Sequence, residues 1–160
     1  MPWKGTVVMK VLIIEDDRQV LSLLKRIFQD RGCDVVAYST PVSCPCNIAV
    51  CPCPMYPDCP SMILTDLDMP IENGLQFLNR LDEKKCRCKH VALMSGKCLN
   101  ESDAMRIAAS GRLFFQKPFD LARIQSWIDV VMQECVQKAP LNNPASGSQE
   151  SPYSAQSFPV

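Results

Sequence analysis

Four short segments of the chain place acidic, hydroxyl or amine side chains directly after apolar runs. VLIIEDD carries Glu15 and Asp16, MILTD ends in Asp66, VALMS ends in Ser95, and FFQK ends in Lys117. Short continuous apolar runs of this kind are typical of the buried strands of a parallel sheet. Sites in such sheets form at the carboxyl ends of the strands, so we expect these five side chains to converge.

Three carboxylates, one hydroxyl and one amine in a common pocket indicate a particular chemistry. Three acids held close together resist ionising together. A hard divalent cation removes that conflict, and Mg²⁺ prefers oxygen ligands of this kind. The cation would also offset the charge of a phosphoryl group, with Lys117 as a second positive contact. A metal-polarised aspartate is then a candidate phosphoryl acceptor.

The segments between these positions alternate between strands and helices. The expected strands are residues 10–15, 34–38, 62–66, 90–95 and 112–116. The expected helices run from Asp17 towards Gly32 and over residues 74–81, 101–109 and 120–137. In the last helix the apolar face is formed by Leu121, Ile124, Ile128, Val131, Met132 and Cys135. This alternation predicts an α/β fold with a parallel sheet covered on both faces.

No helix is expected between the second and third strands. Residues 39–60 contain six prolines, which leave no gap long enough for two helical turns. We therefore predict that a Cys/Pro-rich loop replaces the second helix of the fold.

The cysteines of this loop, with those that precede the fourth strand, form a second candidate site. By topology, Cys59, Cys86 and Cys88 should meet at the amino-terminal end of the sheet, opposite the acids. One interpretation is a thiolate site for Zn²⁺ or an iron–sulfur centre. The other is a set of reduced, partly buried thiols. The candidate ligands are Cys44, Cys46, Cys51, Cys53, Cys59, Cys86 and Cys88.

Composition and charge bound the remaining possibilities. The chain has 160 residues with 17 basic and 17 acidic side chains, so nothing indicates binding to nucleic acid or to an acidic membrane. It shows neither a signal peptide nor an apolar run of about 18 residues, and we expect a cytoplasmic protein. Residues 1–9 are expected to be an N-terminal extension, residues 10–138 a single domain, and residues 139–160 a disordered tail.

In this order, the four segments resemble the receiver domain of two-component response regulators. VLIIEDD is similar to the acidic motif of the first strand, and MILTDLDMPIENG to the phosphoacceptor motif of the third. VALMSG and FFQKPFD are similar to the hydroxyl and lysine motifs. The resemblance implies a flavodoxin-like (βα)5 three-layer sandwich with strand order 2-1-3-4-5. It also implies a stand-alone, chemotaxis-type receiver that is not an enzyme beyond its own aspartyl phosphorylation and dephosphorylation.

The same resemblance implies roles for the acids. Asp66 would be phosphorylated by a partner histidine kinase or phosphotransfer protein. Asp16 and Asp66 would ligate Mg²⁺ with the backbone carbonyl of Asp68, and Glu15 would act through water. Asp68 would also flank the phosphoryl group opposite Lys97, and the two side chains could pair across the pocket.

For signalling, the resemblance implies a switch built on the other strand ends. Lys117 and Ser95 would each hold a phosphoryl oxygen, and Ser95 would shift towards the phosphate. Phe114 would follow into the vacated space and repack the face of helix four, strand five and helix five, which contacts a downstream protein. The alternative is a receiver scaffold regulated through its cysteines by metal or redox chemistry. The complete set of acids, hydroxyl and lysine favours phosphorylation.

Overall fold

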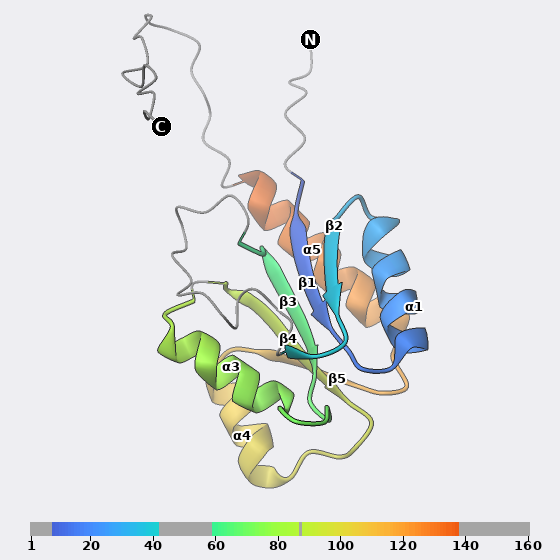
Figure 1. The fold of residues 1–160 in the computed structure, drawn as a ribbon. Coiled ribbons are helices and arrows are strands. Elements are labelled where there is room, and N and C mark those ends of the chain that lie inside the picture. The colour runs from blue at the N-terminus through green and yellow to red at the C-terminus, as the bar shows by residue number, and fades with distance from the viewer. Residues whose placement is uncertain (1–7, 42–58, 87, 138–160) are drawn as a thin grey trace, which may run out of the picture.

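A five-stranded parallel sheet of order β2-β1-β3-β4-β5 forms the centre of the molecule (Figure 1). The structure is a computed structural model, and it describes residues 8–41, 59–86 and 88–137. The strands are β1 (Lys10–Ile14), β2 (Asp34–Tyr38), β3 (Met62–Asp66), β4 (His90–Ser95) and β5 (Leu113–Gln116). The helices are α1 (Arg18–Gln29), α3 (Gly74–Glu83), α4 (Glu101–Ala109) and α5 (Leu121–Gln137). The predicted flavodoxin-like fold and its strand order are confirmed.

The sheet separates two apolar layers, because alternate side chains of a strand point to opposite faces. On one face, α1 and α5 pack against residues such as Val11, Leu64 and Met94. On the other, α3 and α4 pack against the intervening residues, among them Leu12, Ile63 and Leu93. Figure 1 shows the helices in these two pairs on either side of the sheet. Both faces of the sheet are thus covered by apolar side chains, and the polar groups of the site lie at the ends of the strands.

Side-chain caps begin three of the helices close to that edge. Asp17, as expected, accepts from the backbone N–H groups of Gln19 and Val20 and starts α1. Asn73 forms a capping box with Gln76 at the start of α3. Asn100 caps α4 by accepting from the backbone of Asp103. These caps fix where each loop that follows a strand turns into its helix.

The apolar face of α5 differs from the expected one at two positions. Leu121 was expected on the buried face, but it is 40% exposed because it is the first residue of the helix. Trp127 was not expected there, yet it is buried and packs against Phe28 and Phe115.

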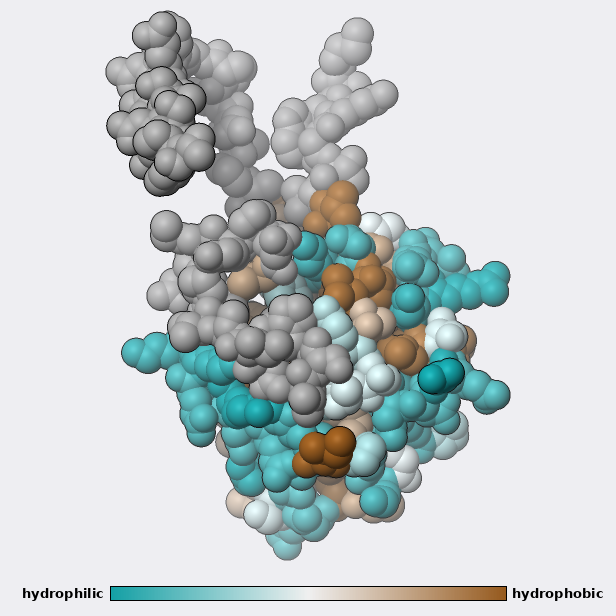
Figure 2. Space-filling view, in the orientation of Figure 1, coloured by the Kyte–Doolittle hydropathy of each residue, from teal (hydrophilic) through white to brown (hydrophobic). Residues whose placement is uncertain are grey.

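The edge strand β2 is only partly covered in the structure. Tyr38 and most of β2 are half-buried, and Figure 2 shows hydrophobic side chains gathered over β1 and β2. Most of the predicted Cys/Pro-rich loop lies outside the described residues, as do most of the N-terminal extension and the predicted tail. In the described part of the chain, every helix is too short or too polar to span a membrane.

Candidate functional site

The carboxyl ends of β1, β3, β4 and β5 bring the predicted side chains to one edge of the sheet. Glu15 directly follows β1, and its backbone N–H still donates to the carbonyl of Tyr38 in β2. Asp66 and Ser95 are the last residues of the adjacent strands β3 and β4. Lys117 follows β5, and its N–H donates to the Ser95 carbonyl at 2.8 Å. Backbone pairing thus holds each of these residues in register with a neighbouring strand.

Three carboxylates form a compact acidic group. Glu15, Asp16 and Asp66 each place one oxygen within 4.8 Å of the others. Glu15 and Asp66 are buried, whereas Asp16 is exposed to solvent. The ammonium of Lys117 lies between the two buried acids, with Nζ 2.7 Å from Glu15 Oε2 and 3.3 Å from Asp66 Oδ1. One cation thus faces three carboxylates.

Burial and this charge imbalance shift the protonation equilibria of the site. Burial raises the pKa of Glu15, and the hydrogen bond from Lys117 offsets this only in part. Burial also raises the pKa of Asp66, again against the attraction of Lys117. Burial alone would lower the pKa of Lys117, but its contacts with Glu15 and Asp66 outweigh burial and raise it. The acids are therefore held in a setting that resists their full ionisation.

The donor set fits a hard divalent cation. Asp66 Oδ1 is buried, and within the described residues it makes an ion pair with Lys117 at 3.3 Å but no well-formed hydrogen bond. A buried carboxylate oxygen without a well-formed hydrogen bond is costly in protein interiors. A cation bound by the three carboxylates would supply a further partner and offset their repulsion, and oxygen ligands are those that Mg²⁺ prefers. Asp66 and Asp16 could bind it directly. The carbonyl of Asp68 stays a predicted ligand.

Ser95 makes a contact that the sequence did not indicate. Its hydroxyl donates to Asp68 Oδ2 at 2.5 Å and accepts from the backbone N–H of Lys97 at 2.9 Å. Asp68 also pairs with the ammonium of Lys97 at 3.2 Å, as predicted from the spacing of the two residues. Burial raises the pKa of Asp68, but the hydrogen bond from Ser95 and the ammonium of Lys97 outweigh burial and lower it. Asp68 is thus held as an acceptor for the Ser95 hydroxyl.

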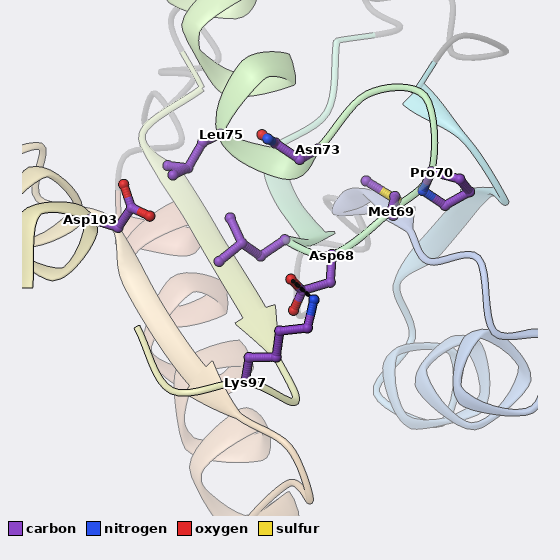
Figure 3. A pocket seen from close by; sticks show the side chains of 8 residues that line it. Asp68, Met69, Pro70, Asn73, Leu75, Lys97 and Asp103 are labelled. Atoms are coloured by element: carbon purple, nitrogen blue, oxygen red, sulfur yellow. Dashed lines mark ion pairs between the residues drawn. The ribbon is translucent and has the colours of Figure 1, made fainter. Parts of the chain in front are cut away.

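A pocket of about 420 Å³ opens beside these residues, between the β3–α3 loop and the start of α4. Asp68 and Lys97 point towards one another at one side of it, and Asp103 of α4 lies at the other (Figure 3). Leu75 and Met69 supply apolar parts of its lining. The pocket therefore adjoins the acidic group through Asp68.

A glycine allows α3 to approach the end of β3. A Cβ on Gly74 would lie 2.3 Å from the backbone oxygen of Asp66, a separation that real Cβ atoms do not show. The N–H of Gly74 donates to the carbonyl of Leu67 at 3.1 Å, which ties the first residue of α3 to the end of β3. The glycine of the MPIENG segment is thus required by a close backbone approach.

Phe114, the predicted switch aromatic, lies on the β5 face that packs against α3 and α4. It is half-buried, and it borders the apolar cluster that contains Ile107 of α4. This position suits a side chain that responds to a change in packing between β5 and α4. Its role as a switch stays a prediction.

The cysteines do not form a second metal site within the described residues. The only metal-type group there consists of Glu15, Asp16 and Asp66, so the proposed Zn²⁺ or iron–sulfur site has no support. The Cys88 thiol lies 3.5 Å from the carbonyl of Ser61, which places it near the start of β3 as the topology predicts. The other candidate ligands Cys44, Cys46, Cys51 and Cys53 lie outside the described residues.

Strand order and site together define a flavodoxin-like α/β protein with an acidic group and a lysine at the switch point of its sheet. A family model, described as the response regulator receiver domain, matches residues 11–129. The chain belongs to this family. Receiver domains of response regulators act in two-component signalling, interact with histidine kinases or phosphotransfer proteins, and typically bind Mg²⁺ at an acidic site.

Solved structures with the same fold come from several organisms. The N-terminal domain of an uncharacterized protein from Wolinella succinogenes is 21% identical, with a TM-score of 0.70 over 82% of this chain and 100% of that one. A response regulator receiver protein from Pseudomonas putida is 19% identical, with a TM-score of 0.65 over 77% and 97%. A receiver domain protein from Clostridium thermocellum is 20% identical, with a TM-score of 0.64 over 81% and 98%. The comparison with curated proteins found no match.

Proposed function

We propose that the protein accepts a phosphoryl group on Asp66 from a histidine kinase or phosphotransfer protein, with Mg²⁺ at the acidic group. The observation that carries this proposal is the buried Asp66 carboxylate, whose Oδ1 has the Lys117 ammonium 3.3 Å away but no well-formed hydrogen bond. A plain structural carboxylate would be well hydrogen-bonded or exposed. A phosphoryl acceptor needs an oxygen with an available lone pair. It also needs nearby positive charge, which stabilises the negative charge that the phosphoryl group adds.

The residues of the chain have distinct tasks in this transfer. An Asp66 oxygen attacks phosphorus, and the bond from phosphorus to the donor imidazole breaks, so that the electron pair leaves with the imidazole. Asp16, Asp66 and the carbonyl of Asp68 would hold the cation, with Glu15 acting through water, and the cation would supply charge neutralisation to the phosphoryl oxygens. Lys117 neutralises a further oxygen. We propose no catalysis beyond this phosphorylation and its reversal.

The signal is proposed to leave through the face formed by α4, β5 and α5. Each of these elements exposes a large hydrophobic side chain, namely Met105, Leu113 and Leu121. Phe114 packs beneath α4, so its repacking would shift α4 relative to β5 and alter this face. The partner on this face is proposed to be a protein of the cytoplasm. A stand-alone receiver would act by such binding, without contact to nucleic acid or membrane.

Labelling with a small phosphodonor tests the acceptor. Acetyl phosphate with Mg²⁺ should add one phosphoryl group, detected by intact-protein mass, and chelation of the metal should prevent this. Asp66→Asn should abolish labelling, and Asp16→Asn should weaken it by weakening the cation site. Asp34→Asn, an exposed aspartate at the opposite edge of the sheet, is the matched control and should label as the parent protein does. Labelling of Asp66→Asn at another residue would refute the assignment.

A phosphoryl mimic offers a second route to the same test. A solved BeF₃-activated receiver domain shares the fold, with a TM-score of 0.63 and 14% identity. Beryllofluoride should therefore bind this protein in the presence of Mg²⁺ and shift the resonances of α4, β5 and α5. Shifts confined to the acidic edge would leave Asp66 as the site but contradict the proposed signalling face.

A further inference from the structure

The Ser95 hydroxyl is fully engaged in the structure, although it has a predicted task at the phosphoryl group. Ser95 has no exposed surface. Its one proton has two acceptors within reach, Asp68 Oδ2 at 2.5 Å and the carbonyl of Lys97 at 3.2 Å. The carboxylate is both closer and charged, so the proton belongs to Asp68. A lone pair of the hydroxyl accepts from the Lys97 N–H at 2.9 Å.

Asp68 is in turn held in the orientation that this hydrogen bond needs. One of its oxygens accepts from Ser95, and the other lies 3.2 Å from Lys97 Nζ (Figure 3). The Lys97 side chain is 79% exposed, so this ion pair adds little stability of its own. The bond from Ser95 is different, because it runs from a buried hydroxyl to a charged acceptor and belongs to the stronger class of hydrogen bonds.

We propose that Asp68 is a positioning residue that restrains the Ser95 hydroxyl in the unphosphorylated state. Ser95 can bind a phosphoryl oxygen on Asp66 only after its bond to Asp68 breaks. The free energy of binding a phosphoryl group is then reduced by the free energy needed to break the bond between Ser95 and Asp68. Asp68 therefore sets the balance between inactive and active states. This inference rests on the proposed function of Asp66.

Two effects of Asp68 must be separated. Its charge repels a phosphoryl group whether or not Ser95 is present, whereas the restraint requires the hydroxyl. A double-mutant cycle isolates the second effect, because Asp68→Ala in the Ser95→Ala background removes the charge alone. The four proteins are the parent, Asp68→Ala, Ser95→Ala and the double variant, each titrated with beryllofluoride and Mg²⁺.

We expect Asp68→Ala to tighten beryllofluoride binding about tenfold more with Ser95 present than with Ser95→Ala, a factor that corresponds to about 1.4 kcal/mol. Asp103→Ala removes another carboxylate that lines the same pocket. The oxygen Oδ2 of Asp103 accepts from Asn100, and no contact joins this carboxylate to Ser95 within the described residues. It should show no such dependence on Ser95. Equal effects of Asp68→Ala in both backgrounds, or weaker binding with Ser95 present, would overturn the proposal.

A spectroscopic signature gives an answer that does not depend on how Ser95→Ala folds. The Lys97 amide proton is bonded to the Ser95 hydroxyl, so its chemical shift reports the position of that hydroxyl. In unliganded Asp68→Ala, this resonance should move towards its position in the beryllofluoride-bound parent protein. An unmoved resonance would contradict the restraint. If the parent protein fails to bind beryllofluoride at all, the proposed function of Asp66 fails; if it binds and the cycle is additive, only the restraint fails.

Discussion

Ile71, five residues after Asp66, has a backbone conformation that its side chain disfavours. Its φ is 72°, in the left-handed region, where a β-branched residue is a true outlier. The residue is 91% exposed, the largest value among the exposed large hydrophobic residues that the structure describes. Figure 2 shows an isolated hydrophobic spot over the β3–α3 loop. The residue thus has an unfavourable backbone conformation, and its side chain gains almost no stabilisation from burial.

Replacement of Ile71 by glycine should raise the free energy of unfolding. The left-handed conformation costs a residue with a Cβ about 1–2 kcal/mol, and glycine removes this cost. Glycine also gives the unfolded chain more freedom, which takes back about 0.5–1 kcal/mol. With the residue 91% exposed, the burial lost is worth roughly 0.2 kcal/mol, about a tenth of the value for a fully buried side chain. The net gain is then about 0.5 kcal/mol.

Urea denaturation followed by circular dichroism is the assay. Ile71→Asn should also stabilise, because asparagine tolerates the left-handed region better than most residues. Ile71→Ala removes the exposed branch but keeps a Cβ, so it should gain less than Ile71→Gly. Gly32→Ala is the reverse control: φ is +78° there, with open space around the Cβ position, and the variant should lose stability. A glycine variant at position 71 that is less stable than the parent would refute the strain.

Three further outcomes follow from the site. Gly74→Ala should destabilise the fold by about 1–3 kcal/mol, because its Cβ meets the Asp66 carbonyl oxygen, whereas Gly96→Ala, with nothing within 4 Å, should not; equal midpoints in urea would contradict this. Lys97→Ala should speed the loss of the phosphoryl group by freeing Asp68 from its ion pair and opening a path for water, and an unchanged decay rate of labelled protein removes that idea. Folding raises the pKa of Asp66 above its ordinary value of about 4. In the presence of a chelator, the free energy of unfolding should therefore fall as the pH rises from about 4 through the raised pKa of the folded state, because the folded protein then loses its bound proton at a cost. The melting temperature of Asp66→Asn should therefore increasingly exceed that of the parent as the pH rises; a constant difference would show that the burial of this charge is not what limits stability.

The fold was predictable because its signals are local. Continuous apolar runs mark strands such as β3, and Asp17 marks the start of α1 before any packing is considered. The acidic group was predictable for a related reason, since parallel strands place their carboxyl ends at one edge. These signals depend on residue type and order alone.

The contacts that the sequence did not indicate depend on the paths of loops. The bond between Ser95 and Asp68 joins the last residue of β4 to the loop after β3, and no periodicity encodes it. The left-handed φ of Ile71 runs against the preference of its own side chain, so propensity predicts the opposite. The burial of Trp127 depends on the crossing of α5 over the aromatic side chains of α1 and β5.

Unfavourable features of the described structure concentrate around the end of β3. Three buried side-chain polar atoms of the described structure have no well-formed hydrogen bond. They belong to Asp66 at the end of β3, Glu72 in the loop after it, and Arg80 in α3. Ile71 lies in the same loop. A fold optimised for stability alone would satisfy or remove such groups, so their persistence in one segment is better explained by a task that needs them. An Asp66 oxygen held only by the Lys117 ion pair is incompletely satisfied and well suited to a cation or a phosphoryl group, and that is the physical reason to propose the function here.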